Sequence, residues 1–291
     1  MRREARRYWD AHPILVDTVE HAPGTRASFD AMWAGFEERL APRQEYQAFV
    51  ERCRGRRMLE MGCGIAMAGR LLSEHGADYF GIDASRRSLA LAQTHLGQQG
   101  LRARFTNADG TSLPFADGTF EVVLSDGVVH HIPDMERACR ELVRVTAPGG
   151  TVRVMVYNRR SYHYALVRFV VCPLLWLAVR VGWLGALARR GPAKLRNLYE
   201  ISRAHGYDPE RILAASTDTS MAGEGNFNPL SHFLIERELR RIFRDLEDPI
   251  FIREQLKYFP LPFPPLRRVI EKHWGFFLTI TARKPSRPAQ A

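Results

Sequence analysis

Short apolar runs alternate with longer stretches in which apolar residues recur every three or four positions, from about residue 57 to residue 158. Runs of roughly four to eight residues favour strands, and the longer periodic stretches favour helices. Regular alternation of the two is typical of βαβ units. We therefore predict an α/β fold: an open, doubly wound, mostly parallel sheet of seven strands with helices on both faces. The strands are expected at 57–61, 78–83, 104–108, 120–125, 151–157, 249–253 and 276–282.

The segments around this alternating region have a different character. Residues 1–55 are polar and amphipathic, and we expect them to form an N-terminal helical lid over one end of the sheet or helices simply packed on the core. The core should span 56–158, and its sheet should be completed by 233–284. Between these parts, 159–232 breaks the alternation and is predicted to be a helical insertion that forms an acceptor pocket. Residues 285–291 should be a disordered tail.

One part of the insertion is very apolar. The run FVVCPLLWLAV covers 169–179, is bounded by Arg168 and Arg180, and is interrupted by Pro173. A membrane-spanning helix needs about twenty apolar residues, so we predict no transmembrane segment. Three interpretations stay open for this run: a buried core helix, the wall of a substrate pocket, or a helix in contact with a membrane surface.

A glycine-containing turn follows the first strand. The stretch RMLEMGCGIAMAG at 57–69 carries Glu60 at the strand end and then Gly62 and Gly64, which allow a sharp turn and close approach of a ligand to bare main chain. Asp83 ends the second strand about twenty residues later, where an acidic side chain can accept hydrogen bonds from two ribose hydroxyls. This spacing predicts a cofactor that contains a nucleoside.

Polar residues also end the next two strands. Glu60, Asp83, Asp109 and the pair 125–126 all fall at the carboxyl ends of predicted parallel strands. Ligands of such sheets bind beside these ends. A single aspartate there is often only a turn former, but four such positions at one edge indicate a ligand site.

Four motifs follow one another in order: LEMGCG at 59–64, GIDAS at 81–85, NADGTSLPFADGTFEVVLSDGVVHHIPD at 107–134 and APGG at 147–150. Together they resemble the class I S-adenosylmethionine-dependent methyltransferases, in particular the small-molecule branch of ubiquinone/menaquinone type. A second set, MVYNRRSYHY at 155–164 and NPLSHF at 228–233, is similar to members with an extended segment after strand five. Two positions depart from the pattern: Ala66 replaces a third glycine, and Ile235 stands where a helix-capping hydroxyl is expected.

The resemblance implies a Rossmann-like core that binds S-adenosylmethionine and releases S-adenosylhomocysteine. It implies methionine-moiety contacts for the 60–64 loop, ribose contacts for Asp83 and adenine contacts for Asp109. Ser125 is expected under the methionine amino group, and His130 in a loop that meets both cofactor and acceptor. The full implied cofactor set is Glu60, Gly62, Cys63, Gly64, Asp83, Ala84, Ala108, Asp109, Gly110, Ser125 and His130.

The chemistry of methyl transfer asks mainly for positioning, because the methyl group leaves a sulfonium readily once a nucleophile is in line with it. A base for the acceptor proton would be a histidine or tyrosine near the site. The candidates are His130, His131 and Tyr157, although His131 also suits a packed structural role. The predicted substrate pocket consists of Tyr8, Trp9, Tyr46, Tyr157 and His232.

Charge and cysteine content argue against a nucleic-acid partner and a metal site. The 291 residues carry a net charge of +10, but the arginines are scattered and no aromatic-rich basic module accompanies them, so nucleic acid is not an expected partner. The cysteines Cys53, Cys63, Cys139 and Cys172 show no metal-type spacing; we expect no metal site, reduced thiols and a cytoplasmic protein.

The sequence therefore predicts a methyltransferase acting on an apolar or anionic small molecule, such as one of secondary metabolism. Two alternatives stay open. One is a lipid or quinone methyltransferase working at a membrane surface, and the other is a non-catalytic or cyclase-type protein that retains the cofactor. The acceptor, the methylated atom and the oligomeric state do not follow from the sequence.

Overall fold

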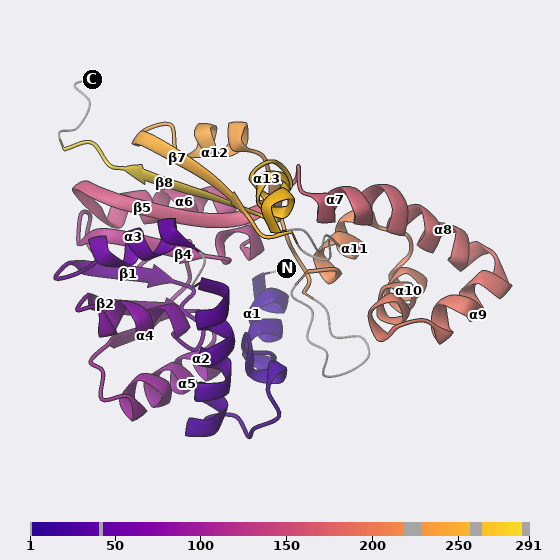
Figure 1. Cartoon of the computed structure of the whole chain (residues 1–291), viewed down its shortest axis with the longest axis horizontal. Helices are drawn as coiled ribbons and strands as arrows, with labels where there is room; N and C mark the ends of the chain where they lie inside the picture. Colours follow the sequence, from indigo (N-terminus) through magenta and orange to yellow (C-terminus); the bar gives the residue numbers. More distant parts are fainter. Residues whose placement is uncertain (1, 41–42, 218–227, 257–263, 287–291) are drawn as a thin grey trace.

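The computed structural model describes residues 2–40, 43–217, 228–256 and 264–286. Figure 1 shows a central sheet covered by helices, with a second group of helices extending from one end of it. The strands are β1 Arg57–Met61, β2 Asp78–Asp83, β3 Arg104–Asn107, β4 Phe120–Asp126, β5 Thr146–Asn158, β6 Phe233–Leu234, β7 Glu247–Glu254 and β8 Phe277–Arg283.

The sheet has the order β3-β2-β1-β4-β5-β8-β7, and the two-residue β6 pairs with β5. Strands β1 to β5 run parallel, whereas β8 is antiparallel to both β5 and β7. The predicted open, mostly parallel sheet is therefore confirmed. Strand order reverses at β1, so the carboxyl ends of β1 and β4 border the crevice in which such folds bind ligands.

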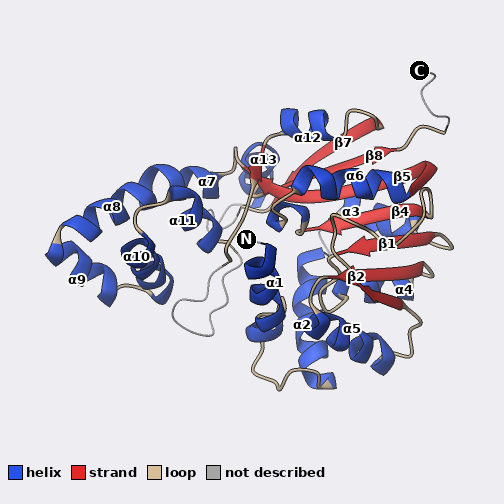
Figure 2. Ribbon diagram, turned by 180° about the vertical axis from the view of Figure 1, so that it is seen from behind, coloured by secondary structure: helices blue, strands red, loops and turns tan. Residues whose placement is uncertain are grey.

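Helices cover both faces of the sheet, as Figure 2 shows from behind. Successive residues of β4 point to opposite faces: Val123 packs with α6 and α12, while Val122 and Leu124 pack with α3, α4 and α5. This double burial explains why the run is apolar without interruption. The core helices are α2 Arg26–Leu40, α3 Gln44–Arg52, α4 Met67–Glu74, α5 Arg86–Gln98, α6 Met135–Val145, α12 Glu236–Ile242 and α13 Pro264–Trp274.

The first helix, α1 Arg2–Ala11, is tied to the start of α5. Ser85 caps α5 by accepting a hydrogen bond from the Ser88 amide, and its hydroxyl also donates to Asp10 Oδ1 at 2.9 Å. The Arg87 guanidinium donates to the Ala11 carbonyl at 3.0 Å. A short 3-10 turn, Val16–Thr18, then leads towards α2.

Several boundaries differ from the prediction. Strand β5 begins at Thr146 rather than 151, because Thr146 pairs with Phe120. The turn after β1 extends from Gly62 to Ala66, so helix α4 begins at Met67. Helix α13 was not predicted. At Ile235 the missing capping hydroxyl is offset by Glu238, whose carboxylate accepts from the Ile235 amide at 2.9 Å.

Residues 162–215 form a separate group of helices that we call the helical lobe (Figure 1). Its first three elements make one continuous helix, Tyr162–Arg180, with a π-helical turn at Val167–Val171. The lobe consists of α7 Tyr162–Leu166, that turn, α8 Cys172–Arg180, α9 Gly182–Arg190, α10 Ala193–His205 and α11 Pro209–Ala215.

The long helix of the lobe is the one described helix with the length and composition to cross a membrane. The sequence prediction excluded such a segment because it counted only the residues between Arg168 and Arg180, whereas the helix is 19 residues long. Within the structure 28% of its most apolar window is buried. The predicted tail at 285–291 falls largely outside the described residues, as do 218–227 of the predicted insertion.

Candidate active site

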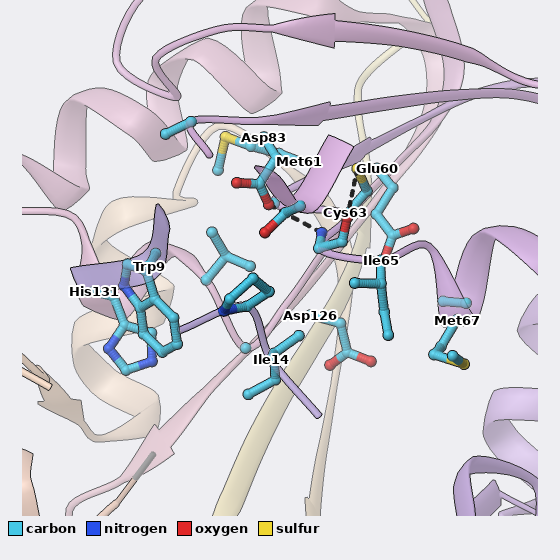
Figure 3. A pocket seen from close by; sticks show the side chains of 18 of the residues that line it. Trp9, Ile14, Glu60, Met61, Cys63, Ile65, Met67, Asp83, Asp126 and His131 are labelled. Carbon is cyan, nitrogen blue, oxygen red and sulfur yellow. Dashed lines mark hydrogen bonds between the residues drawn. The ribbon is translucent and has the colours of Figure 1, made fainter. Parts of the chain in front are cut away.

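A cavity of about 890 Å³ lies at the carboxyl ends of β1 to β4. Its floor consists of the loops that follow these strands, and α1 and the segment after it close it from the other side. Figure 3 shows acidic side chains of the strand ends on one side of the cavity and Trp9 beside His131 on the other. The volume lies within the range typical of sites for drug-sized ligands, about 300–1,000 Å³.

The loop after β1 exposes main chain to this cavity. Gly62 and Gly64 both have positive φ, +76° and +53°. A Cβ at Gly62 would lie 2.3 Å from Val128 Cγ2, and one at Gly64 would lie 3.0 Å from Ile14 Cγ2. Larger residues would therefore strain the loop and fill the space in which a ligand can reach the backbone. Ala66 also adopts a left-handed conformation, φ 58°, at the start of α4.

Asp83 is held rigidly at the end of β2. Its Oδ2 accepts from the Gly64 amide at 2.9 Å and its Oδ1 from the Ser85 amide at 2.8 Å. Each oxygen retains a further acceptor position, because a carboxylate oxygen has two lone pairs. Burial raises the pKa of Asp83, and the amide hydrogen bonds oppose that rise. This arrangement suits two neighbouring hydroxyl groups such as those of a ribose.

Asp109 is fixed in a similar way at the end of the β3 loop. Its Oδ1 accepts from both the amide and the hydroxyl of Thr111, each at 2.8 Å. Ala84, Ala108 and Gly110 line the same part of the cavity. A Cβ at Gly110 would lie 2.8 Å from the Met61 sulfur, so this turn too presents bare backbone. The donor and acceptor set fits a nucleoside bound between the ends of β2 and β3.

Two further carboxyl groups line the cavity, the buried Glu60 and the half-buried Asp126. Tyr79 donates a hydrogen bond of 2.5 Å to Glu60 Oε2, and burial raises the pKa of Glu60 to about 8. Burial likewise raises the pKa of Asp126, which the positive charges of Arg153, Arg43 and Arg39 oppose. Both carboxyls are therefore prepared to compensate a positively charged ligand group, because they stand in a low-dielectric environment.

The structure brings most of the predicted site residues together. The cavity is lined by Tyr8, Trp9, Glu60, Gly62, Cys63, Gly64, Asp83, Ala84, Ala108, Asp109, Gly110, His131 and Tyr157. Among these, the Trp9 and His131 rings lie 5.2 Å apart. The Nδ1 atom of His131 is 2.8 Å from the Leu230 carbonyl and 3.0 Å from the Asn228 amide nitrogen, and its Nε2 is buried.

Four predicted residues lie away from the cavity lining. Ser125 is fully buried, because the neighbouring Asp126 takes the cavity side of the strand end. His130 is also fully buried, with its ring 4.0 Å from that of Tyr157, and burial lowers its pKa well below the usual value. Tyr46 packs under the Arg153 guanidinium, and His232 lies outside, beside Pro133 and Met135.

Other cavity residues were not assigned a role from the sequence. The sequence marks Asp126 only as a strand end, and Asn107 carries the same positional signal. The Asn107 amide donates to the carbonyls of Asp83 and Ala84 at 2.9 and 3.0 Å, which braces the two strand ends. Arg39 and Phe277 line the cavity from α2 and β8, and no local motif marks them.

The sequence is similar to known methyltransferases over part of its length. A family model described as "Methyltransferase domain" matches residues 59–154. An uncharacterized methyltransferase of Mycobacterium sp. (strain JLS) is 31% identical over 173 residues, which is 59% of each chain. A ubiquinone biosynthesis O-methyltransferase of Sinorhizobium medicae (strain WSM419) is 32% identical over 124 residues, 42% of this chain and 50% of that one. The chain thus spans well under two thirds of the length of these curated relatives.

Solved structures share the fold over nearly the whole chain. The PH0226 protein of Pyrococcus horikoshii OT3 has a TM-score of 0.55 at 14% identity and covers 96% of this chain and 98% of its own. The [4+2]-cyclase SpnF has a TM-score of 0.53 at 17% identity, with 97% and 95% covered. At these identities the likeness concerns the Rossmann-like fold alone.

Proposed function

We propose, from the premise that this chain is built on a class I S-adenosylmethionine-dependent methyltransferase domain, that it methylates an apolar or anionic small molecule. The observation that supports this most directly is the Asp83 carboxylate, fixed by the Gly64 and Ser85 amides at the edge of a large cavity. When bound, S-adenosylmethionine supplies an activated methyl group on a sulfonium centre.

The residues at the strand ends would hold that cofactor. In this proposal Asp83 accepts from the ribose hydroxyls and Asp109 accepts from the adenine amine, while Ala84 and Ala108 lie beside the base. The bare loop at Gly62 to Gly64 and the buried Glu60 face the methionine moiety, where two positive charges need compensation.

The acceptor would occupy the other side of the cavity. Trp9, His131, Tyr157 and Phe277 form a connected set of rings there. Arg39 adds a positive charge to the cavity wall near Asp126. These side chains orient the acceptor in line with the methyl group, which is the main requirement of the displacement. They also exclude water from the site. Since His131 Nε2 is buried, we assign this histidine to positioning the acceptor rather than to removing its proton.

The cofactor part of the proposal is tested by titration calorimetry with S-adenosylmethionine and S-adenosylhomocysteine. Asp83→Ala removes both ribose acceptors, and each hydrogen bond to a charged group contributes about 1.5–3 kcal/mol, so affinity should fall by at least about a hundredfold. Asp245→Ala, at a side chain 82% exposed on the surface, should leave affinity unchanged. Equal affinity of the Asp83 variant and the parent protein would refute this assignment of the ribose site.

The acceptor part is tested by mass spectrometry of candidate compounds incubated with protein and cofactor. A methyltransferase adds one CH₂ to its acceptor and releases S-adenosylhomocysteine in equal amount. An acceptor that is converted without gaining mass, with the cofactor recovered intact, would instead support a cyclase-type activity in the same cavity.

A further inference from the structure

Exposed apolar side chains gather on one part of the helical lobe. Of the fifteen large hydrophobic residues exposed in the described chain, eight lie between positions 169 and 187. We call this set the α8–α9 face, because most of its residues belong to α8 and α9, the helices at the end of the lobe farthest from the sheet in Figure 1. It consists of Phe169, Val170, Leu174, Trp176, Leu177, Val179, Trp183 and Leu187, with Trp183 70% and Phe169 68% exposed.

The long helix of the lobe is apolar on both sides, but its own chain covers only one side. Val167, Cys172, Leu175 and Ala178 point inward and are buried with side chains of α10 and α11. The opposite side carries Phe169, Leu174 and Leu177 into solvent. A helix that is hydrophobic all round requires apolar surroundings on both faces. The second face therefore indicates an apolar partner outside the described chain.

The segment that carries this face is basic. Residues 159–199 contain eight arginines and lysines and no aspartate or glutamate. Arg180 lies over the Trp176 ring at 4.0 Å, and Arg189 and Arg190 end α9 close to the exposed Leu187. Apolar side chains bordered by arginine and tryptophan are typical of surfaces that enter the interface of a lipid bilayer.

We propose that the α8–α9 face docks on the surface of a membrane that contains anionic lipids. A second copy of the chain is a poorer occupant, because pairing two such faces would bring like charges together. A spanning arrangement is also disfavoured, because α10 and α11 cover the inner side of the helix. The helix would instead lie along the interface, with Trp183 and Leu187 reaching the acyl region and the arginines near the phosphates.

The face is connected to the cavity through its own packing. Tyr157, which lines the cavity, belongs to the same buried cluster as Val167, Cys172 and Leu175 of the lobe. If the proposed function holds, the acceptor side of the active site therefore stands next to the membrane-facing lobe. This extends the proposed function to an acceptor with a lipid-soluble body, which reaches the cavity from the bilayer.

The test is sedimentation of the full chain with vesicles, in the absence of cofactor and acceptor. The chain should sediment with vesicles of phosphatidylcholine and phosphatidylglycerol and much less with phosphatidylcholine alone. Trp183→Ser combined with Leu187→Ser should reduce binding at least tenfold. Arg189→Gln combined with Arg190→Gln should reduce it about fivefold per charge and remove the preference for the anionic lipid.

Matched controls are available outside the lobe. Trp274→Ser on α13 removes a tryptophan that is 53% exposed, and Arg244→Gln removes an exposed charge; neither should change vesicle binding. Failure of the parent protein to sediment, an equal loss in the controls, or resistance of the bound chain to alkaline carbonate would overturn surface docking. A stable dimer that the Trp183 and Leu187 changes dissociate, without vesicle binding, would assign the face to a second copy.

The methyltransferase proposal and the membrane-docking proposal can be tested independently. Calorimetry with S-adenosylmethionine should give the same affinity for the lobe variants as for the parent chain, because the cofactor residues lie at the strand ends. Loss of lipid binding with intact cofactor affinity leaves the methyltransferase proposal in place. Lipid binding without any cofactor affinity would leave the docking face and remove the methyltransferase proposal.

Discussion

At the scale of single residues, the most unusual group in the cavity is the carboxyl of Glu60. It is only 5% exposed, accepts a hydrogen bond from Tyr79, and has a pKa raised to about 8 by burial. Near neutral pH the cavity without ligand therefore holds this side chain largely as the neutral acid. A cation bound beside it favours the charged form, so binding of S-adenosylmethionine at pH 7 should release a proton.

The same shift makes stability depend on pH. Because the pKa of Glu60 is 4.5 as an ordinary glutamate and about 8 in the folded chain, the folded state binds more protons between these values. The free energy of unfolding should therefore fall as pH rises from about 5 to 8. Glu60→Gln should remove a few kcal/mol of this fall, measured by urea unfolding at both pH values. Burial also raises the pKa of Asp83 and of Asp126, so both contribute a slope of the same sign.

Glu37→Gln, at an exposed glutamate on α2, is the matched control for Glu60→Gln and should leave the slope as it is in the parent chain. Proton release on cofactor binding is measured separately, by calorimetry in buffers of different ionisation enthalpy. Identical pH slopes for parent and Glu60→Gln would show that the buried carboxyl does not control this part of the pH profile.

At the scale of elements, the loop between β1 and α4 depends on main-chain conformation more than on side chains. Gly62→Ala places a methyl group 2.3 Å from Val128 Cγ2 at a φ of +76°. We expect a loss of about 1–3 kcal/mol in stability and a much larger proportional loss of cofactor affinity, because the amides of the loop must move. Thermal unfolding and calorimetry on the same variant measure both effects.

Gly97→Ala in α5 is a control of the same chemical size. Outside the neighbouring residues and the backbone of the helix itself, no atom lies within 4 Å of the added methyl group. Since the residue is helical, the change should stabilise the chain by about 0.5–1 kcal/mol and leave cofactor affinity unchanged. If both alanine variants bound the cofactor like the parent, the bare backbone at Gly62 would have no role in binding.

Most of the sheet could be predicted because each strand has a local signature. The apolar run at 122–124 and the polar strand ends Asp83 and Asp109 needed no information from distant residues. The one-residue choice between Ser125 and Asp126 could not be made, because it depends on which face of β4 meets the cavity. Tyr46 has the same amphipathic setting as the cavity residue Tyr8, and only the packing of α3 beneath Arg153 separates them. The local pattern lacks that long-range information.

At the scale of the whole molecule, the cavity is assembled from parts that are far apart in the chain. Residues of α1, the strand ends, Thr217 near the end of the lobe, and Phe277 of β8 all line it. Its geometry therefore depends on how the lobe is joined to the sheet. That joint is aromatic: Tyr157 of β5, Phe233 of β6 and Phe276 before β8 share one buried cluster with the lobe helices.

Phe276 is the residue on which this joint depends most directly. It is 1% exposed, and its ring centre lies 4.6 Å from that of Tyr157 and 4.9 Å from that of His163 in α7. Phe276→Ala should cost about 3–5 kcal/mol in urea unfolding, because it leaves a cavity between sheet and lobe. Trp274→Ala, two residues away but 53% exposed, should cost less than about 1 kcal/mol.

Amide hydrogen exchange locates the effect of the Phe276 change within the molecule. The loss of protection should be largest in α7 and α8 of the Phe276 variant, and smallest in β1 and β2. Uniform loss across lobe and sheet would mean that the two parts unfold as one unit and that the joint has no separate stability.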